Sequence, residues 1–211
     1  MPEPIVIVGC GGHGREIFGI IAAVNEAGGE LWKVVGFLDD APAEANLRRL
    51  ERLGAAWLGP GDLLAQLDAR YVIGIGDPRI RSDVAAALAP HGRPAARLVH
   101  PAATVGPDNE LADGVVLFAG ARVTTNVTLG RHVHLNQNST VGHDSVLAEC
   151  VQVNPLAAVS GDCRIGRAVL IGTNAAVLQG RTVADRARVG AGACVVRDVD
   201  AGRTVKGVPA A

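Results

Sequence analysis

A six-residue repeat governs the second half of the chain. From Val105 to Val195 every sixth residue is Val, Leu or Ile, and none of the sixteen positions in this register is an exception. An α-helix repeats about every 3.6 residues and a simple strand about every two, so neither explains the pattern. A short strand followed by a corner does explain it, because three such units make one triangular coil of a parallel β-helix.

Small residues occur where such a coil needs them. Four places after the aliphatic position a narrow corner requires a small side chain, and the chain supplies one repeatedly: Ala121, Ser139, Ser145, Ala157, Cys163, Ala175, Ala187 and Ala193. With three inward positions to a coil, the sixteen positions predict about five coils without an inserted loop. The second half is therefore expected to be all-β.

Apolar strands alternate with helical stretches in the first hundred residues. The predicted strands cover residues 5–8, 34–38 and 71–77, and the predicted helical stretches cover residues 15–25, 44–53, 62–67 and 79–88. This alternation is typical of an α/β unit with a small parallel sheet of the Rossmann-like kind, which binds ligands at the carboxyl ends of its strands. Because Pro101 ends the preceding element, we predict two domains, residues 1–98 and residues 99–211.

Composition and charge exclude several classes of partner. A net charge of −1, a pI of about 6.6 and 3% aromatic residues provide no basic groove or stacking platform, so we expect no nucleic-acid partner. The apolar run from Ile5 to Val8 is too short for a signal peptide or a membrane span, which predicts a cytoplasmic protein without a membrane partner. The four cysteines lie far apart without a C-x-x-C motif, which argues against a zinc site or a disulfide framework.

A glycine-rich turn follows the first predicted strand. It has the spacing G-x-G-G-x-G from Gly9 to Gly14, not the G-x-G-x-x-G of dinucleotide-binding turns. Its glycines allow a phosphate to approach the N-terminus of the following helix, but they also suit tight packing of strand and helix, and the motif alone leaves both open. Asp39 and Asp40 end the second strand, where they either accept hydrogen bonds from a ribose or a base or cap a helix.

Three histidines lie within twelve residues of the repeat: His132, His134 and His143. No pair among them has the five-residue spacing with which hexapeptide-repeat carbonic anhydrases bind their metal, so we expect no metal. Asp144 follows His143, and a carboxylate beside an imidazole orients the ring and stabilises its charged form, as a general base requires. Both residues come just after the inward position Val141, so their side chains should point out of the prism. A surface histidine without a role is the alternative.

Motifs along the whole chain resemble the bacterial nucleotide-sugar acetyltransferases of the hexapeptide-repeat superfamily. These motifs are residues 5–14, 37–40, 73–76, 135–136 and 141–144 and the tail 205–210. The most similar members acetylate the 4-amino group of a nucleotide-linked 4-amino-4,6-dideoxy sugar, and the sialic acid O-acetyltransferases share the layout. The resemblance implies a left-handed β-helix, a homotrimer, acetyl-CoA as co-substrate in the groove between adjacent prisms, and a nucleotide sugar held by the N-terminal domain.

The resemblance also implies roles for individual residues. His143 matches the catalytic base, and Asp144 matches its acidic neighbour. The nucleotide sugar would be bound by Gly11, Gly12, His13, Gly14, Asp39, Asp40, Gly76 and Asn136. Acetyl-CoA would be bound by Gln152, Gly161, Thr173, Gly207, Val208 and Pro209. Gln152 departs from the family, because several relatives carry a second histidine at this position and an amide does not titrate.

The expected reaction is direct attack of the sugar amine on the thioester of acetyl-CoA, with His143 taking up the proton. A backbone N–H near Gly161 would stabilise the oxyanion. Two other functions stay open. One is an O-acetyltransferase acting on a sialic acid or another sugar hydroxyl, and the other is a non-catalytic β-helix binding protein.

Overall fold

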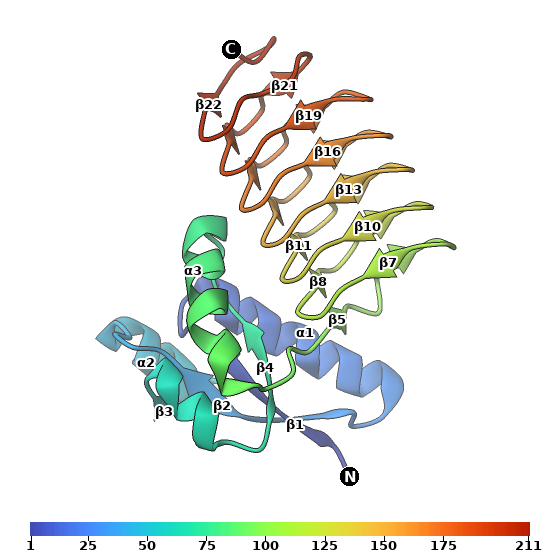
Figure 1. Ribbon diagram of the computed structural model, residues 1–211. Helices are drawn as coiled ribbons and strands as arrows, with labels where there is room; N and C mark the ends of the chain where they lie inside the picture. Colours follow the sequence, from blue (N-terminus) through green and yellow to red (C-terminus); the bar gives the residue numbers. More distant parts are fainter.

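Two differently built parts make up the molecule (Figure 1), which a computed structural model describes over all 211 residues. The chain first forms a small sheet with helices and then, from Leu98 on, winds into a stack of short strands. None of the helices combines the length and the apolar character that a membrane span requires.

Four parallel strands form the N-terminal sheet in the order β3-β2-β1-β4. Their bounds are β1 Glu3–Val8, β2 Trp32–Leu38, β3 Trp57–Gly59 and β4 Arg70–Ile73. The helices are α1 Gly12–Gly28, α2 Glu44–Arg52 and α3 Pro78–Leu88, with the 3-10 helices η1 Gly61–Gln66 and η2 Ala89–His91. This arrangement confirms the predicted α/β unit. Strand β3 was not predicted, because three residues are too few to show a period.

Local sequence explains where these elements begin. All four residues of the apolar run from Ile5 to Val8 are buried, as expected for a parallel strand covered on both faces. The Asp77 side chain caps α3 by accepting from the N–H of Arg79 at 2.8 Å, and Pro78 takes the first helical position, where its missing N–H costs nothing. Helix α1 begins at Gly12, three residues before its predicted start, since glycines contribute nothing to an apolar period.

Three parallel sheets form the faces of a left-handed β-helix, and each contributes one strand to a coil. Paired residues are 18 positions apart, as Leu135 and Val153 are. The seven-strand sheet contains β5 Leu98–Val99, β8 Val116–Leu117, β11 His134–Leu135, β14 Gln152–Val153, β17 Leu170–Ile171, β20 Arg188–Val189 and β22 Thr204–Val205. The six-strand sheet contains β6 Thr104–Val105, β9 Arg122–Val123, β12 Thr140–Val141, β15 Ala158–Val159, β18 Ala176–Val177 and β21 Cys194–Val195. The five-strand sheet contains β7 Glu110–Leu111, β10 Thr128–Leu129, β13 Val146–Leu147, β16 Arg164–Ile165 and β19 Thr182–Val183.

The predicted inward register is confirmed over most of its length. Aliphatic residues such as Leu135, Val141 and Val153 are fully buried in one continuous cluster, together with corner residues such as Ala157. A hydrophobic interior of this kind is what holds coils of two-residue strands together, because each coil alone has almost no core.

The corners of the coils use a left-handed backbone. The third residue after an inward position has a positive φ, for example 53° at Asn126 and 62° at Asp144. Residues that tolerate this conformation occupy most of these corners: Asp108, Gly114, Gly120, Asn126, Asn138, Asp144, Asp162, Asn174, Gly180 and Gly192. The catalytic candidate Asp144 is therefore also a structural corner residue.

Both ends of the β-helix differ from the prediction. Val105 is in register but 40% exposed, because β6 is the edge strand of its sheet and no coil covers it. After Val195 the register shortens by two residues, and Val199 and Val205 take the next inward positions. The strands make about six coils instead of five, and no loop interrupts them.

The N-terminal part packs on the seven-strand sheet. Ile17 and Ile20 of α1 belong to the same buried cluster as Val116 and Phe118 of the β-helix, and Figure 1 shows α1 below β5 and α3 alongside β11. In a three-sided prism the corner between the other two sheets, where the chain passes from β12 to β13, lies opposite this covered face. The two exposed sheets and that corner stay free of the N-terminal part.

Candidate active site

A cavity of about 680 Å³ opens at the carboxyl ends of β1, β2 and β4. Its wall contains six of the eight residues expected to bind a nucleotide sugar: Gly11, Gly12, His13, Asp39, Asp40 and Gly76. Ligands of open α/β sheets bind at this edge, and small-molecule sites have volumes of roughly 300–1,000 Å³. The cavity therefore has the place and the size of a ligand site.

Backbone N–H groups hold the two aspartates at the end of β2, Asp39 and Asp40. The two oxygens of Asp39 accept from the N–H of Cys10 at 2.8 Å and of Ala41 at 3.1 Å, which ties the glycine turn to the end of β2. One oxygen of Asp40 accepts from the N–H of Gly61 at 2.7 Å. Asp39 is thus largely occupied, whereas Asp40 keeps one oxygen for a ligand.

The glycines of the turn divide between packing and the cavity. Gly14 is buried, and a Cβ there would lie 2.0 Å from the carbonyl oxygen of Gly9. It serves the contact of strand and helix and does not line the cavity, which corrects the expected contact with a nucleotide sugar. Gly12 is exposed, and a Cβ there would meet only Arg15 Nη2 at 3.8 Å. Gly12 is the glycine whose backbone a ligand can approach.

His13 connects the cavity to the β-helix. Its Nε2 lies 2.9 Å from Nδ1 of His134 on β11, and its ring centroid lies 5.1 Å from that of Phe118. Burial lowers the pKa of His13 and the pKa of His134, so both rings are neutral near pH 7. Asn136, just beyond His134, is 7% exposed, and its side-chain oxygen has no partner. One nitrogen of His13 is thus committed to the β-helix.

Arg81 of α3 forms hydrogen bonds with the seven-strand sheet, the face of the β-helix that His13 also contacts. Its fully buried guanidinium donates to the carbonyl oxygens of Ile75 at 2.5 Å and His132 at 3.1 Å, and to Gln152 Oε1 at 2.9 Å. Burial lowers the pKa of Arg81 to about 10, so it remains charged at neutral pH. Gln152 is 1% exposed and its Nε2 donates to Asn154 Oδ1. Gln152 therefore lies beneath the N-terminal part with both polar atoms occupied, which does not fit the expected contact with acetyl-CoA.

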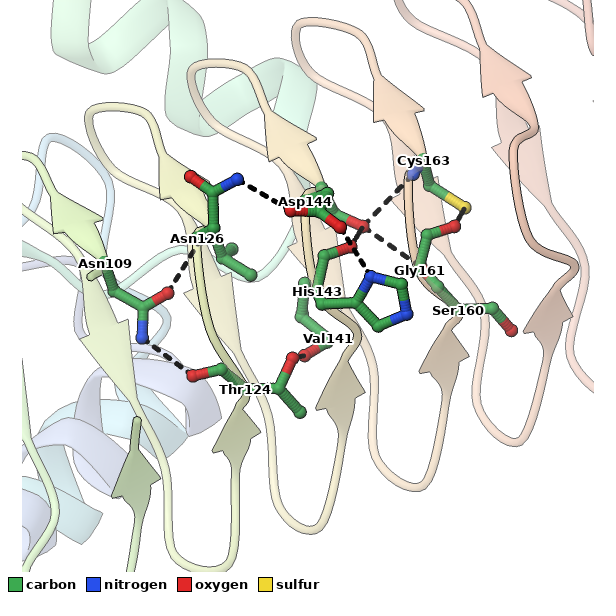
Figure 2. Close-up of polar contacts among 11 residues, drawn as sticks. Asn109, Thr124, Asn126, Val141, His143, Asp144, Ser160, Gly161 and Cys163 are labelled. Carbon is green, nitrogen blue, oxygen red and sulfur yellow. Dashed lines mark hydrogen bonds and ion pairs between the residues drawn. The ribbon is translucent and has the colours of Figure 1, made fainter. Parts of the chain in front are cut away.

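His143 and Asp144 form a hydrogen-bonded pair on the exposed corner between β12 and β13 (Figure 2). His143 Nδ1 lies 2.7 Å from Asp144 Oδ2, and Asn126 Nδ2 donates to Asp144 Oδ1 at 2.6 Å. The hydrogen bonds from His143 and Asn126 hold the pKa of Asp144 below its usual range, so the carboxylate is ionised at neutral pH. An ionised carboxylate accepts the Nδ1–H, which leaves Nε2 of the neutral ring without a proton.

The ring of His143 lies against Gly161 of the next coil (Figure 2). A Cβ at Gly161 would lie 2.5 Å from His143 Nε2. Ser145 fixes the corner below, because its Oγ donates to Ser160 O at 3.0 Å and accepts from the N–H of Cys163 at 3.1 Å. The N–H of Gly161 donates to no acceptor in the protein. A basic nitrogen and a free backbone donor therefore occupy one corner.

Other residues expected to bind acetyl-CoA lie on a second corner. Thr173 follows β17 and Gly207 follows β22, two strands of the seven-strand sheet, and the tail continues through the exposed Val208 and Pro209. Gly161 instead follows β15 of the six-strand sheet. One copy of the chain thus does not bring these residues together.

The three histidines of the repeat do not form a common site. His132 and His134 are buried beneath the N-terminal part, whereas the His143 side chain is 53% exposed on the opposite corner. Burial, with the nearby positive charges of Arg131 and Arg81, lowers the pKa of His132 to about 4. These two histidines belong to the contact between the parts of the molecule.

Asn126 and Arg81 were not among the predicted site residues. Asn126 precedes Asp144 by 18 positions, which is one coil, so stacking the repeat would have placed the two side by side. Arg81 had no such signal, because most of its acceptors, among them the carbonyl oxygens of His132, Cys150 and Val151, lie far away in the sequence.

Comparison with known proteins adds to this geometry. Residues 4–88 match the family model described as the PglD N-terminal domain. A search of curated proteins found no match.

Solved structures match the chain over its whole length. The acetyltransferase domain of PglB from Neisseria gonorrhoeae is 32% identical, with a TM-score of 0.87 over 99% of this chain and 98% of that one. The same domain in complex with acetyl coenzyme A is 32% identical, with a TM-score of 0.86 over 100% and 99% of the two chains. PerB from Caulobacter crescentus, in complex with CoA and GDP-perosamine, is 30% identical, with a TM-score of 0.86 over 99% and 96%.

Proposed function

Since the chain belongs to the hexapeptide-repeat nucleotide-sugar acetyltransferases, we propose that it transfers the acetyl group of acetyl-CoA to the 4-amino group of a nucleotide-linked 4-amino-4,6-dideoxy sugar. The observation that carries the proposal is the hydrogen-bonded pair of His143 and Asp144 on an exposed corner of the β-helix. The complexes of the two relatives with acetyl coenzyme A and with GDP-perosamine and CoA support the two substrates.

His143 is the general base in this proposal. The sugar nitrogen forms a bond to the thioester carbonyl carbon, His143 Nε2 accepts a proton from that nitrogen, and the C–S bond then breaks. The imidazolium gives its proton to the leaving sulfur, so the histidine ends as it began. Asp144 stabilises the imidazolium, and Asn126 keeps the carboxylate in place.

Gly161 supplies the oxyanion donor. Its N–H is free of protein acceptors and lies on the same corner as the His143 ring. A preorganised donor of this kind typically contributes roughly 3 kcal/mol to stabilising the transition state.

The nucleotide is held in the cavity of the N-terminal part. The backbone at Gly11 and Gly12 meets the phosphates, and the free oxygen of Asp40 accepts from the ribose or the base. Residues 1–98 thus serve as the nucleotide-sugar unit and residues 99–211 as the acetyl-transfer unit. The proposed location is the cytoplasm, where acetyl-CoA and nucleotide sugars are available.

A homotrimer completes the active site. The cavity lies by the seven-strand sheet, whereas His143 lies on the corner opposite that face, so a neighbouring copy has to bring the two together. The same packing places the corner of Thr173 and Gly207 from one copy beside the corner of Gly161 from the next. Acetyl-CoA then binds in the groove between adjacent prisms.

The experiment that tests this function is an acceptor screen. The protein is incubated with acetyl-CoA and with UDP-, dTDP- or GDP-linked 4-amino-4,6-dideoxy sugars, and both CoA release and product mass are measured. We expect one acetyl group on the amine of one of these sugars and none on the matching 4-hydroxy sugars. Acetylation of a hydroxyl acceptor such as sialic acid, but of no amine, would contradict the proposal. If no acceptor leads to the release of CoA, a non-catalytic binding protein would be favoured instead.

A further inference from the structure

Three arginines, Arg15, Arg49 and Arg52, line a groove of about 500 Å³ between α1 and α2 at the rim of the nucleotide cavity. Gly12 lines both the groove and the cavity. Arg15 Nη1 donates to Cys10 O and to Asn46 Oδ1, each at 2.9 Å, and Arg49 Nη1 donates to the same Asn46 oxygen at 3.0 Å. Two guanidinium groups therefore converge on one neutral amide at the cavity wall.

No carboxylate neutralises this pair of charges. Neither Arg15 nor Arg49 has a carboxylate oxygen within 4.0 Å, whereas the adjacent Arg48 is paired with Glu44. Glu16, the one acidic residue of the groove, lies 3.6 Å from His13 Nδ1 instead. Like charges held together repel each other, and an arriving anion would relieve that repulsion while accepting charge-assisted hydrogen bonds.

The position of the pair indicates which anion it receives. Arg15 Nη2 lies 3.8 Å from the Cβ position at Gly12, where the backbone of the turn approaches a phosphate in the proposed function. Asp39, Asp40 and Asp62 also line the cavity, and carboxylates repel phosphates but accept hydrogen bonds from a ribose or a base. A nucleotide with its nucleoside at the aspartates can present its phosphates to the arginines.

We propose that Arg15 and Arg49 bind the diphosphate of the nucleotide sugar and thereby select nucleoside diphosphates over nucleoside monophosphates. This inference rests on the proposed function, whose acceptors are diphosphate-linked sugars, and it assigns the side chains that bind their phosphates. Arginine is suited to the task because its planar guanidinium forms paired hydrogen bonds with phosphate oxygens. The second phosphate gives the ligand the charge and the reach that a monophosphate lacks.

The test compares Arg49→Gln with the matched control Arg48→Gln. Both residues are exposed on α2, but only Arg49 lines the groove. Dissociation constants are measured by calorimetry for UDP, dTDP and GDP and for the matching monophosphates. Because hydrogen bonds to charged groups are worth at least about 1.5 kcal/mol, we expect Arg49→Gln to weaken diphosphate binding about tenfold. Monophosphate binding should change less than about twofold, and Arg48→Gln should leave both unchanged.

A second variant tests the geometry of the pair. Arg15→Lys keeps the positive charge but loses the planar fork, so diphosphate binding should weaken while the melting temperature remains that of the wild type. Equal weakening of diphosphate and monophosphate binding, or equal effects of Arg49→Gln and Arg48→Gln, would overturn the inference. If the wild type binds nucleotides but both groove variants bind them equally well, the inference alone fails. If the wild type binds no nucleotide, the proposed function fails with it.

Discussion

At the scale of single residues, the proposed base depends on neighbours from three coils. Asp144 orients His143, Asn126 from the preceding coil holds Asp144, and Gly161 from the following coil leaves room for the ring. Asn126 and Asp144 can interact because both occupy left-handed corner positions that stack 18 residues apart. The catalytic arrangement is thus built into the repeat and does not require a loop.

Replacing Gly161 by Ala should displace the base without harming the fold. The added methyl would lie 2.5 Å from His143 Nε2, and because Gly161 has no positive φ, alanine does not strain its backbone. We expect kcat to fall at least about tenfold while the melting temperature changes little. Gly19→Ala is the control, since nothing lies within 4 Å of that position on α1. Wild-type kcat in Gly161→Ala would mean that the ring position is not used in catalysis.

Asp144→Asn should impair turnover more than Asp144→Ala, although asparagine has nearly the same shape as the aspartate that it replaces. Asn126 donates to one oxygen of Asp144, so the introduced amide would keep its oxygen there and turn its NH₂ toward His143 Nδ1. That donor would favour the tautomer with a proton on Nε2, which cannot act as a base.

Steady-state kinetics of the two variants, alone and combined with Asn126→Ala, check this prediction. We expect kcat of Asp144→Asn to be about tenfold or more below that of Asp144→Ala. The difference should disappear in the Asn126→Ala background, where the amide can rotate. Equal kcat values of the two single variants would argue against the tautomer assignment.

At the scale of the elements, the repeat made the β-helix predictable, but not its ends. The register ends at Val195 because two residues are missing before Val199, so the last coil follows a spacing that a strict six-residue search does not find. A second periodicity, of Gly, Asn and Asp at the left-handed corners, was present in the sequence and marks the turns directly. In the N-terminal part the long apolar strands were predicted, while β3 was too short.

The site residues were predictable where they depend on the repeat, on the glycine turn or on the ends of the predicted strands, as Asp39, Asp40 and Gly76 do. The exposed pair of His143 and Asp144 follows from the inward position of Val141. The burial of Gln152 could not be predicted in this way. The repeat shows to which sheet Gln152 belongs, but not which of the three sheets the N-terminal part covers. Contacts between distant parts of the chain, such as those of Arg81, leave no periodic signal.

Acid should weaken the contact between α1, α3 and the seven-strand sheet. The pKa values of His13, His132 and His134 are lowered by burial, that of His132 to about 4, so the folded protein keeps these rings neutral. Unfolded histidines take up protons below about pH 6.5, so the unfolded state then binds more protons than the folded state. The free energy of unfolding therefore decreases as the pH is lowered. From pH 7 to pH 5 we expect a loss of about 2 kcal/mol from His132 alone.

Urea unfolding at pH 7, 6 and 5 measures this loss. The variant His132→Gln, which has no ring to protonate, should lose less stability over the same range. An unfolding free energy that is independent of pH between 7 and 5 would show that these histidines are not held neutral in the fold.

At the scale of the whole molecule, the nucleotide cavity and His143 lie on opposite sides of one prism. His13 joins the cavity to β11, while His143 follows β12 on the corner away from that sheet. In the proposed homotrimer, identical copies around a threefold axis would place different surfaces of the same chain against each other, so that the cavity of one copy meets the base of another. Catalysis in the proposed function therefore depends on the assembly as well as on the single chain.

Mixed assemblies test this arrangement. His143→Ala lacks the base, and Gly12→Val blocks the backbone at the cavity, so each variant alone should be nearly inactive. If the two residues act from different copies, co-expressed variants should regain roughly a quarter of wild-type activity, since random mixing gives each half of a site an even chance of being intact. No recovery in assemblies shown to be mixed would mean that both residues act from one copy.

The most direct test of the central claim is the turnover of His143→Ala with acetyl-CoA and the nucleotide-linked amino sugar that the acceptor screen identifies. Loss of a general base commonly lowers kcat about 10²–10⁴-fold, whereas loss of a binding contact mainly raises KM. We predict a fall of kcat in that range, nearly unchanged dissociation constants for both substrates, and partial recovery at higher pH, where more of the amine is deprotonated. A kcat within about threefold of the wild type, far short of the general-base range, would contradict the account.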